Sequence, residues 1–197
     1  MGKRAFDIIG SALGLLLLLP VLLACALAVR LDSRGPVFFR QTRVGLHGQP
    51  FTILKFRTMV DCPLDNGLLI TATGDSRITA AGRWLRRTKL DELPQLINVL
   101  RGDMSLVGPR PEVPRYVALY PAAARGLVLS VRPGITDEAS ILFRDESELL
   151  ARATDPDAYY MSELLPRKLE IHARYARDHS LAGDWRILVQ TLRTLVS

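Results

Sequence analysis

Hydrophobic residues dominate the start of the chain, where Ile8–Val29 form a run of 22 residues without a charged side chain. An unbroken helix of this length would reach roughly 33 Å, enough to cross the hydrocarbon core of a bilayer. Pro20 interrupts the run, because its ring removes a backbone donor and collides with the carbonyl of Leu16. The pattern therefore predicts two shorter helices, Ile8–Leu19 and Val21–Val29, with a break at Pro20.

Basic residues flank this run on both sides. Short loops rich in Lys and Arg stay on the cytoplasmic face of a membrane, so both ends are predicted to lie on the same side. A re-entrant segment, which enters the membrane and returns, meets this requirement. The flanking residues are Lys3, Arg4, Arg30, Arg34, Arg40 and Arg43.

Two other interpretations of the run stay open on the residues alone. A single transmembrane anchor kinked at Pro20 fits the periodicity as well as a re-entrant segment does, because membrane helices tolerate proline. A secretory signal would use Lys3 and Arg4 as its basic start and Cys25 as a lipid-attachment site. The sequence that follows the run argues against export.

The rest of the chain is predicted to be an α+β, mainly helical unit. Residues 36–41 and 51–56 are predicted strands of a small β-hairpin, separated by a turn-rich joint. Residues 62–75 are a predicted loop. An interfacial amphipathic helix is predicted over 77–88, with Trp84 at the headgroup level of a membrane.

Further helical segments are predicted toward the C-terminal end. A short apolar helix covers residues 92–100, and another covers 111–125 with a break at Pro121. Asp155 opens a longer helical region with a joint at Pro166, and Asp184 is the predicted cap of the last helix. The predicted organisation is a membrane segment with its flanks over residues 1–34 and a compact cytoplasmic domain over residues 35–197.

Charge and cysteine content narrow the choice of partners. The net charge of +6 suits an anionic lipid surface, a phosphate-bearing substrate or nucleic acid. No base-reading motif is present, so no nucleic-acid partner is expected. Cys25 and Cys62 do not form a disulfide framework, in agreement with a reducing cytoplasm.

The adjacent carboxylates of Asp91 and Glu92 are the main candidates for chemistry. On the residues alone, Asp91 is most simply a helix N-cap and Glu92 a charge that complements the helix dipole. The functional alternative is a phosphate site, since Mg²⁺ commonly takes one or two carboxylates plus phosphate oxygens. Arg57, Arg86 and Arg110 carry the forked donors that bind phosphate.

Several longer motifs accompany this pair. They are Lys3-Arg4-Ala5-Phe6-Asp7, Gly35-Pro36-Val37-Phe38-Phe39-Arg40-Gln41-Thr42-Arg43-Val44-Gly45, Lys55-Phe56-Arg57-Thr58-Met59, Leu90-Asp91-Glu92-Leu93-Pro94-Gln95, Met104-Ser105-Leu106-Val107-Gly108-Pro109-Arg110-Pro111 and Arg132-Pro133-Gly134-Ile135-Thr136. In this order, and over nearly the whole chain, they resemble the bacterial sugar transferases, monotopic phosphoglycosyl transferases that start glycan assembly on a polyprenol phosphate.

The resemblance implies a ping-pong reaction. Asp91 would attack the phosphate of a uridine diphosphate sugar, release UMP and pass the phosphosugar to a polyprenol phosphate, which is undecaprenyl phosphate by this resemblance. A covalent intermediate divides one difficult transfer into two easier ones. Mg²⁺, held at Asp91, would neutralise the diphosphate. Glu92 would assist through the metal or as a base, and the residues do not separate these roles.

The resemblance also assigns the remaining residues and the location. Arg86 and Arg110 match positions that hold phosphate, Arg57 is the basic residue of the hairpin motif, and Pro20 is the break of a re-entrant helix. The implied location is the cytoplasmic face of the bacterial inner membrane. The implied partners are a uridine diphosphate sugar, a polyprenol phosphate, inner-membrane lipid and downstream glycosyltransferases.

Two departures from the family pattern affect these expectations. Leu19 replaces a serine whose hydroxyl can bond a freed helix carbonyl. Residues 137–146 replace a Gly- and Gln-containing segment, which leaves sugar or nucleotide recognition open. Arg132, Asp137 and Glu138 are the candidates there, although solvated acidic loop residues would also explain the two carboxylates.

A non-enzymatic role remains the alternative. A membrane-anchored basic protein that binds anionic lipid or a protein partner would carry the same charge pattern. In that case the Asp91 carboxylate would have no function in cells.

Overall fold

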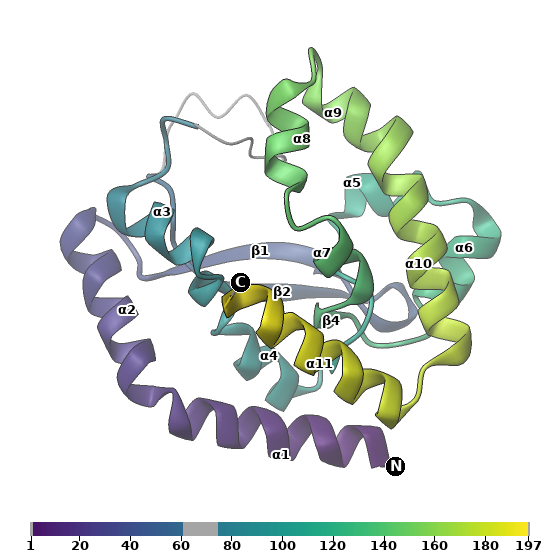
Figure 1. Ribbon diagram of the computed structural model, residues 1–197, viewed down its shortest axis with the longest axis horizontal. Helices are drawn as coiled ribbons and strands as arrows, with labels where there is room; N and C mark the ends of the chain where they lie inside the picture. The colour runs from purple at the N-terminus through teal and green to yellow at the C-terminus, as the bar shows by residue number, and fades with distance from the viewer. Residues whose placement is uncertain (1, 61–74, 197) are drawn as a thin grey trace.

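The computed structural model describes residues 2–60 and 75–196. The predicted loop over residues 62–75 lies outside this range except for Asp75. The chain begins with two helices, α1 (Gly2–Leu17) and α2 (Leu19–Asp32), which follow one edge of the molecule in Figure 1. Their axes are bent by 64° at the break. The predicted helix–break–helix arrangement is therefore confirmed.

The break lies at Leu18, slightly earlier than predicted. Pro20 occupies the first turn of α2, where its missing N–H leaves no intrahelical bond unmade. Backbone bonds continue on both sides, since Leu18 N–H donates to Gly14 O at 2.9 Å and Leu22 N–H donates to Leu18 O at 2.8 Å. None of the described helices is alone long and apolar enough to cross a bilayer, whereas the bent pair together meets that criterion.

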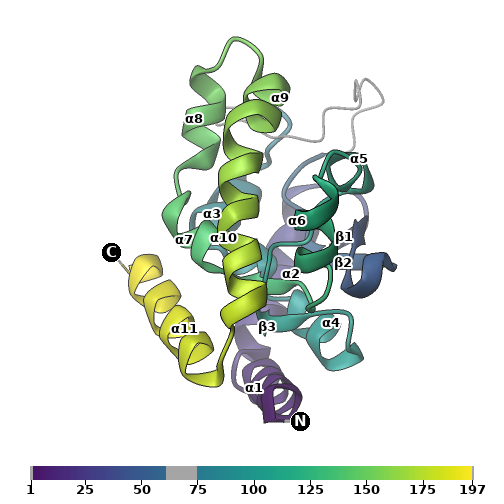
Figure 2. The same cartoon turned by 90° about the vertical axis from the view of Figure 1, so that its right-hand side faces the viewer.

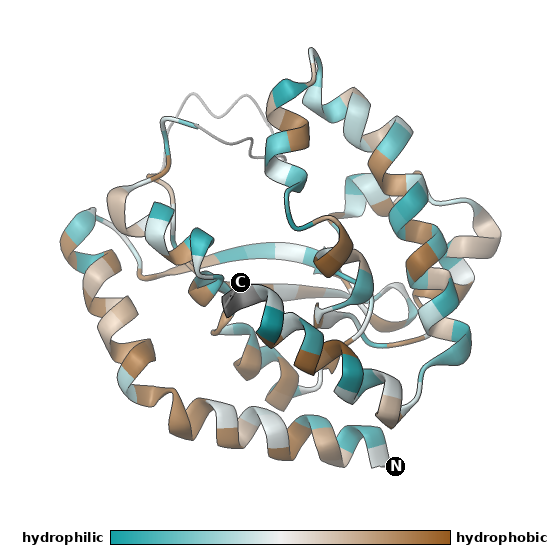
Figure 3. Cartoon of the chain, in the orientation of Figure 1, coloured by the Kyte–Doolittle hydropathy of each residue, from teal (hydrophilic) through white to brown (hydrophobic). Residues whose placement is uncertain are grey.

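The polarity of α1 is inverted relative to helices that cover a water-soluble core, and both α1 and α2 expose many apolar side chains. The buried residues of α1 are the polar Asp7 and Ser11, and those of α2 are Cys25 and Val29. Figure 3 shows the apolar character of both helices. The exposed large apolar side chains are Ile8, Ile9, Leu13, Leu16, Leu17, Leu19, Val21, Leu23, Leu27 and Leu31.

The predicted β-hairpin is confirmed. Strands β1 (Phe38–Val44) and β2 (Pro50–Phe56) pair antiparallel and are joined by the short 3₁₀ helix η1 (Leu46–Gly48). Ile53 and Leu54 of β2 are buried, so the hairpin carries one side of the core.

A run of short helices follows the hairpin. They are α3 (Ala80–Arg87), the 3₁₀ turn η2 (Leu90–Glu92) and α4 (Gln95–Arg101). Helix α3 begins later than predicted, because the Thr79 hydroxyl accepts a hydrogen bond from Gly82 N–H and caps it. The predicted apolar face of α3 divides: Leu85 is fully buried, whereas Trp84 is 48% exposed.

Two short strands form a parallel pair that the sequence patterns do not predict. β3 (Ser105–Val107) pairs with β4 (Gly134–Thr136). The backbones beyond the pair approach closely, since a Cβ on Gly134 would lie 2.1 Å from the backbone nitrogen of Gly108. Glycine is therefore required here, and two of the sequence motifs meet at this contact.

The C-terminal part is helical. Asp155 caps α9 as predicted by accepting a hydrogen bond from Ala158 N–H, and a π-helical turn, η3, forms the joint before Pro166. The elements are α5 (Pro114–Val117), α6 (Ala122–Val128), α7 (Glu138–Leu142), α8 (Glu146–Arg152), α9 (Pro156–Tyr159), η3 (Tyr160–Leu164), α10 (Leu165–Asp178) and α11 (Leu181–Val196).

The predicted cap of the last helix is wrong. Helix α11 already begins at Leu181, and the Ser180 hydroxyl accepts the hydrogen bond from Gly183 N–H. Asp184 lies inside the first turn and is fully buried, because its carboxylate accepts hydrogen bonds from Lys3 Nζ and the Tyr175 hydroxyl. Helix α11 forms an outer layer over α7 and the β3–β4 pair (Figures 1 and 2).

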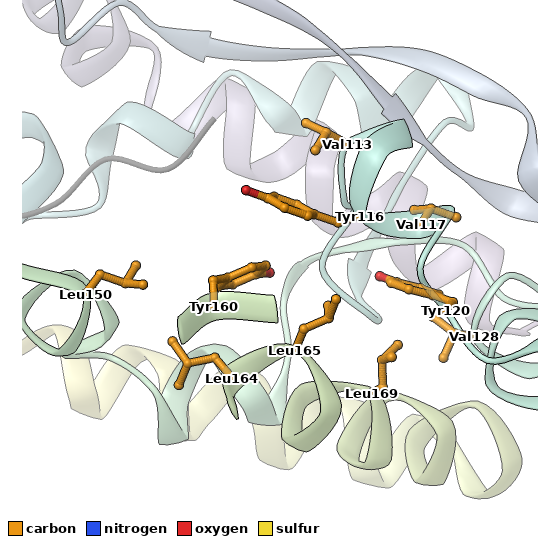
Figure 4. Close-up of a cluster of buried hydrophobic side chains, with 10 residues drawn as sticks. All are labelled: Val113, Tyr116, Val117, Tyr120, Val128, Leu150, Tyr160, Leu164, Leu165 and Leu169. Atoms are coloured by element: carbon orange, nitrogen blue, oxygen red, sulfur yellow. The ribbon is translucent and has the colours of Figure 1, made fainter. Parts of the chain in front are cut away.

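The largest group of buried apolar residues joins α5 and α6 to η3 and α10. Figure 4 shows Tyr116 and Tyr160 at its centre, with ring centroids 4.9 Å apart. The group consists of Val113, Tyr116, Val117, Tyr120, Val128, Leu150, Tyr160, Leu164, Leu165 and Leu169. A second group joins α2 to α3 and β2 through Cys25, Val29, Phe56 and Leu85.

Candidate functional site

Asp91 is a buried carboxylate without a hydrogen-bond partner on one of its oxygens. It lies in η2, which follows Lys89, a residue with a left-handed backbone (φ 56°). The residue is 8% exposed, and its Oδ1 atom is buried with no partner. Helix α4 begins only after Pro94, without a side-chain cap, so the N-cap interpretation of Asp91 is wrong. A buried polar atom left unpaired requires an explanation, and a ligand that contacts it is one.

Glu92 has the opposite environment. Its Oε1 atom accepts hydrogen bonds from Lys55 Nζ and Arg110 Nη2, both at 2.7 Å, and Oε2 accepts from Arg110 Nη1 at 3.3 Å. Burial opposes ionisation, but the charges and hydrogen bonds of Arg110 and Lys55 outweigh it and hold the pKa of Glu92 well below its usual range. Glu92 is therefore a stable anion that orients two cations.

The pKa values of the two neighbouring carboxyl groups are shifted in opposite directions. Burial and the adjacent charge of Glu92 raise the pKa of Asp91, and Lys55, Arg86 and Lys89 oppose this rise. An added positive ligand or a phosphate-bound cation would favour the Asp91 anion. Such divergence between neighbouring carboxyl groups is typical of active sites.

Arg86 approaches the pair from α3. Its Nε atom donates to the Thr58 hydroxyl at 3.0 Å. Burial lowers the pKa of Arg86, and the charges of Asp91 and Asp75 counteract this effect. The structure thus brings together Asp91, Glu92, Arg86 and Arg110, four of the five residues that the sequence placed at one site; Arg57 is the fifth.

Arg57 has a different environment. Its guanidinium donates to the Arg34 carbonyl at 2.7 Å and to the Ser33 carbonyl and hydroxyl, both at 2.8 Å. A Cβ on Gly35 would lie 2.0 Å from Arg57 Nη1, so the side chain fills the space under this turn. Arg57 holds the connection between α2 and β1, and its predicted contact with phosphate stays a prediction.

The three residues predicted for sugar or nucleotide recognition have different environments. Arg132 Nε donates to the Gly102 carbonyl at 2.9 Å, at the end of α4. Asp137 is not a solvated loop residue, because it is 2% exposed and caps α7 by accepting from Ser140 N–H at 2.6 Å. Glu138 is exposed and pairs with Arg174 at 3.0 Å.

Asp137 also lies against a buried histidine. The Nε2 atom of His172 is 3.5 Å from the Asp137 carboxylate. Burial opposes ionisation of Asp137, but His172 and the Ser140 N–H lower its pKa overall. This pair fixes α7 against α10.

A cavity of about 520 Å³ opens beside Glu92 and Arg110. Part of its wall is charged, and another part is apolar and includes residues of α1, the α1–α2 break and α11. The charged residues include Arg43, Lys89, Glu92, Arg110, Glu112, Glu146 and Lys168. The apolar residues include Gly14, Leu18, Leu93, Leu96, Leu106, Leu188 and Leu192. Asp91 itself is not part of the wall.

The sequence patterns missed several residues of this site. Lys55 is the first residue of the motif Lys55-Phe56-Arg57-Thr58-Met59, but its position in a predicted strand indicates only a polar side chain on one face. Glu112, Tyr160 and Lys168 belong to no motif, and their contacts join segments far apart in the chain. Alternation within β2 places Lys55 on the same side as the apolar Ile53. This alternation was the available signal that Lys55 points toward the interior.

The residues fit a divalent cation only with help from a substrate. Among the described residues, no cluster of three or more His, Cys, Asp or Glu side chains is placed to hold a metal ion. The unpaired Oδ1 atom of Asp91 fits one ligand position, and Glu92 is already paired with two cations. Mg²⁺ bound through one carboxylate and phosphate oxygens is compatible with this arrangement.

Several bacterial proteins with assigned names are similar to this chain. An Escherichia coli protein named UDP-glucose:undecaprenyl-phosphate glucose-1-phosphate transferase is 42% identical over 193 residues, 96% of this chain and 39% of the relative. A Caulobacter vibrioides protein of the same name is 40% identical, over 99% of this chain and 70% of the relative. An Aeromonas hydrophila UDP-N-acetylgalactosamine-undecaprenyl-phosphate N-acetylgalactosaminephosphotransferase is 36% identical, over 99% of this chain and 44% of the relative.

The chain thus spans about two fifths of the length of the Escherichia coli relative. The family model described as bacterial sugar transferase matches residues 1–197. Together with the paired carboxylates and their arginines, this match shows that the chain belongs to the bacterial sugar transferase family.

Proposed function

We propose that this protein transfers a sugar 1-phosphate from a uridine diphosphate sugar to a polyprenol phosphate, most simply undecaprenyl phosphate. The observation that carries the proposal is the unpaired Oδ1 atom of Asp91 beside a Glu92 that Arg110 and Lys55 neutralise. The names of the relatives support the same substrates.

The proposed reaction has two steps. First, a carboxylate oxygen of Asp91 bonds to the phosphorus that bears the sugar, the bond from this phosphorus to the bridging oxygen breaks, and UMP leaves with the electron pair. Second, a phosphate oxygen of the polyprenol phosphate attacks the same phosphorus and frees Asp91. The product is a polyprenol diphosphate sugar. The first step requires that donor binding makes Asp91 Oδ1 accessible.

The neighbouring cations support both steps. Arg110 and Lys55 are fixed by Glu92 and present positive charge where the phosphates would lie. Arg86, held by Thr58, is the second arginine on this side of Asp91. Glu92 acts by positioning these donors, because its low pKa disfavours proton transfer. Mg²⁺, bound through Asp91 and the diphosphate, would neutralise charge on the leaving UMP.

The location follows from the acceptor. Leucines of α1 and α2 face outward while Asp7 and Ser11 are buried, a polarity that suits lipid around these helices. The apolar wall of the cavity includes Leu18 at the break, so an isoprenoid chain could reach Glu92 and Arg110 without leaving the bilayer surface. We place the protein on the cytoplasmic face of the bacterial inner membrane as a re-entrant, monotopic protein, where downstream glycosyltransferases would use its product.

The test is a two-substrate assay with an adduct search. Purified protein is incubated with Mg²⁺ and a panel of uridine diphosphate sugars, without acceptor, and intact mass is measured. The expected result is a phosphosugar adduct that maps to Asp91 with release of UMP, and its loss on adding polyprenol phosphate.

Asp91→Asn should form no adduct and no product. Asp178→Asn, which makes the same change at an exposed position, should retain both. Turnover without an adduct at Asp91 would overturn the covalent route. Family membership argues against the non-enzymatic alternative, and full glycolipid synthesis by Asp91→Asn in cells would revive it.

A further inference from the structure

A group of buried and half-buried charged and polar residues lines the cavity beyond Glu92 and Arg110. We call it the Glu112 cluster; it consists of Arg43, Glu112, Glu146, Tyr160 and Lys168. Its members come from β1, the segment before α5, α8, η3 and α10. Segments far apart in the sequence therefore converge on one side of the cavity.

The contacts within the Glu112 cluster are specific. The Tyr160 hydroxyl donates to Glu112 Oε1, and Arg43 Nη1 lies 3.7 Å from Glu112 Oε2. Lys168 Nζ lies 2.6 Å from Glu146 Oε2 and 4.9 Å from the centroid of the Tyr160 ring. Glu112 and Lys168 are 7% and 4% exposed, so these charges are withdrawn from water.

The cluster lies next to the proposed phosphate site. Glu112 follows Arg110 by two residues, and the charge of Arg110 acts on Arg43 while that of Glu146 acts on Arg110. A ligand whose phosphates contact Arg110 would therefore extend its attached group toward Glu112 and Glu146.

The charge of the cluster is balanced. Two cations, Arg43 and Lys168, face two anions, Glu112 and Glu146, whereas the phosphate site has an excess of cations. Fixed carboxylates and ammonium groups that alternate in sign suit a neutral group with many hydroxyls, because each hydroxyl both donates and accepts. A carboxylate on the ligand would meet Glu112 or Glu146 and be repelled.

The ring of Tyr160 is not free to stack on a nucleobase. The Tyr160 ring already packs against Tyr116 and lies under Lys168, as Figure 4 shows for the two tyrosines. Its faces are therefore engaged, and stacking on a free aromatic face is the usual means of holding a base.

We propose that the Glu112 cluster binds the sugar of the donor and selects neutral sugars over uronic acids. This assignment rests on the proposed transferase function. The carboxylates of Glu112 and Glu146 accept hydrogen bonds from sugar hydroxyls, and Lys168 and Arg43 donate to the sugar oxygens.

The test compares two donors and three variants. kcat and KM are measured for UDP-glucose and UDP-glucuronate with wild type, Glu146→Gln, Glu112→Gln and the control Glu148→Gln. Glu146 and Glu148 both lie on α8, but Glu148 is exposed and pairs only with Arg152 among the described residues. Wild type should prefer UDP-glucose, and the two cluster variants should lose this preference by about tenfold, through a higher KM for UDP-glucose and a lower one for UDP-glucuronate.

The polyprenol phosphate KM should not change in any variant, which separates sugar binding from a general loss of folding. Unchanged donor preference in Glu146→Gln, or equal use of both donors by wild type, would overturn the assignment while the transferase function stands. If wild type uses no uridine diphosphate sugar at all, the proposed function itself fails. Glu146→Gln keeps the test decisive if Glu112→Gln does not fold.

Discussion

The two adjacent carboxylates show how single residues acquire different properties from their contacts. Glu92 accepts hydrogen bonds from two cations, whereas Asp91 has a buried oxygen with none. The protein therefore maintains an unfavourable group at Asp91, and Glu92 stabilises the fold. Strain of this kind at one position is expected where a side chain must react.

Asp91→Asn should increase stability while abolishing activity. The pKa of Asp91 is raised in the folded state, so its ionised form is destabilising above the folded pKa, and this cost disappears below about pH 4, where the unfolded aspartate is also protonated. Near neutral pH we expect the free energy of unfolding to rise by about 1 kcal/mol. Denaturant unfolding at neutral and acid pH measures the difference, and a loss of stability at neutral pH would contradict the raised pKa.

Lys89 should help to keep the acid limit of activity low. The charge of Lys89 lowers the pKa of Asp91 in opposition to burial and Glu92. Lys89→Met removes this charge, so the acid limb of the profile of kcat/KM against pH should move to higher pH. Lys89→Arg keeps the charge and should leave the limb in place. Identical limbs in all three proteins would show that another group limits the reaction.

The limits of sequence interpretation are visible at these residues. Asp91, Glu92, Arg86 and Arg110 were identifiable because they lie in or beside contiguous motifs. Lys55 was not assigned, because its role depends on Glu92, which is 37 positions later in the chain. Arg57 illustrates the converse, since a basic residue in a motif has its guanidinium bonded to backbone carbonyls.

At the scale of elements, local patterns predicted what local forces determine. The β1–β2 hairpin followed from alternation around a short joint, and the broken helix followed from Pro20. The β3–β4 pair was missed, because strands of three residues carry no periodicity and parallel pairing depends on distant segments. The start of α11 was misplaced because aspartate is a residue type favoured at helix N-caps, whereas Asp184 is paired with Lys3 inside the first turn.

Helix α3 offers a test of how an element positions Arg86. A Cβ on Gly82 would lie 2.1 Å from the backbone oxygen of Thr58, so Gly82→Ala must push α3 away from its neighbour. We expect a loss of about 2–3 kcal/mol in stability and a larger KM for the donor, since Arg86 moves with the helix.

Gly126→Ala in α6 is the matched control. A Cβ there meets nothing within 4 Å, so the alanine should stabilise the helix by about 0.5–1 kcal/mol without changing the donor KM. Thermal unfolding and donor kinetics of both variants measure the contrast. Equal effects of the two substitutions would show that the contact with Thr58 does not hold α3.

At the scale of the whole molecule, the basic start of the chain ties the N-terminal segment to the rest. The charge pattern of the sequence predicts that Lys3 and Arg4 form a cytoplasmic flank of a membrane segment. In the structure Arg4 Nη1 donates to the Val99 carbonyl at 2.7 Å, and Asp7 accepts from the Ser105 hydroxyl and Leu106 N–H. These contacts set the position of α1, and therefore of the break that borders the cavity.

Lys3 should stabilise the fold more than an exposed basic residue of the flanks does. Its Nζ lies 2.5 Å from Asp184, which is fully buried on α11, so Lys3→Met leaves that carboxylate with Tyr175 as its remaining side-chain donor among the described residues. Removing one partner of a buried pair costs on the order of 3 kcal/mol, whereas replacing both partners by apolar groups costs less. We therefore expect Lys3→Met to lower the midpoint of thermal unfolding, and Lys3→Met with Asp184→Leu to restore part of the loss.

Arg40→Met is the matched control. It removes the same charge from the exposed side of the other flank and should change stability by no more than about 0.5 kcal/mol. If Lys3→Met and Arg40→Met behave alike, Lys3 acts only through its charge near the membrane, and α1 and α11 are not coupled through this pair.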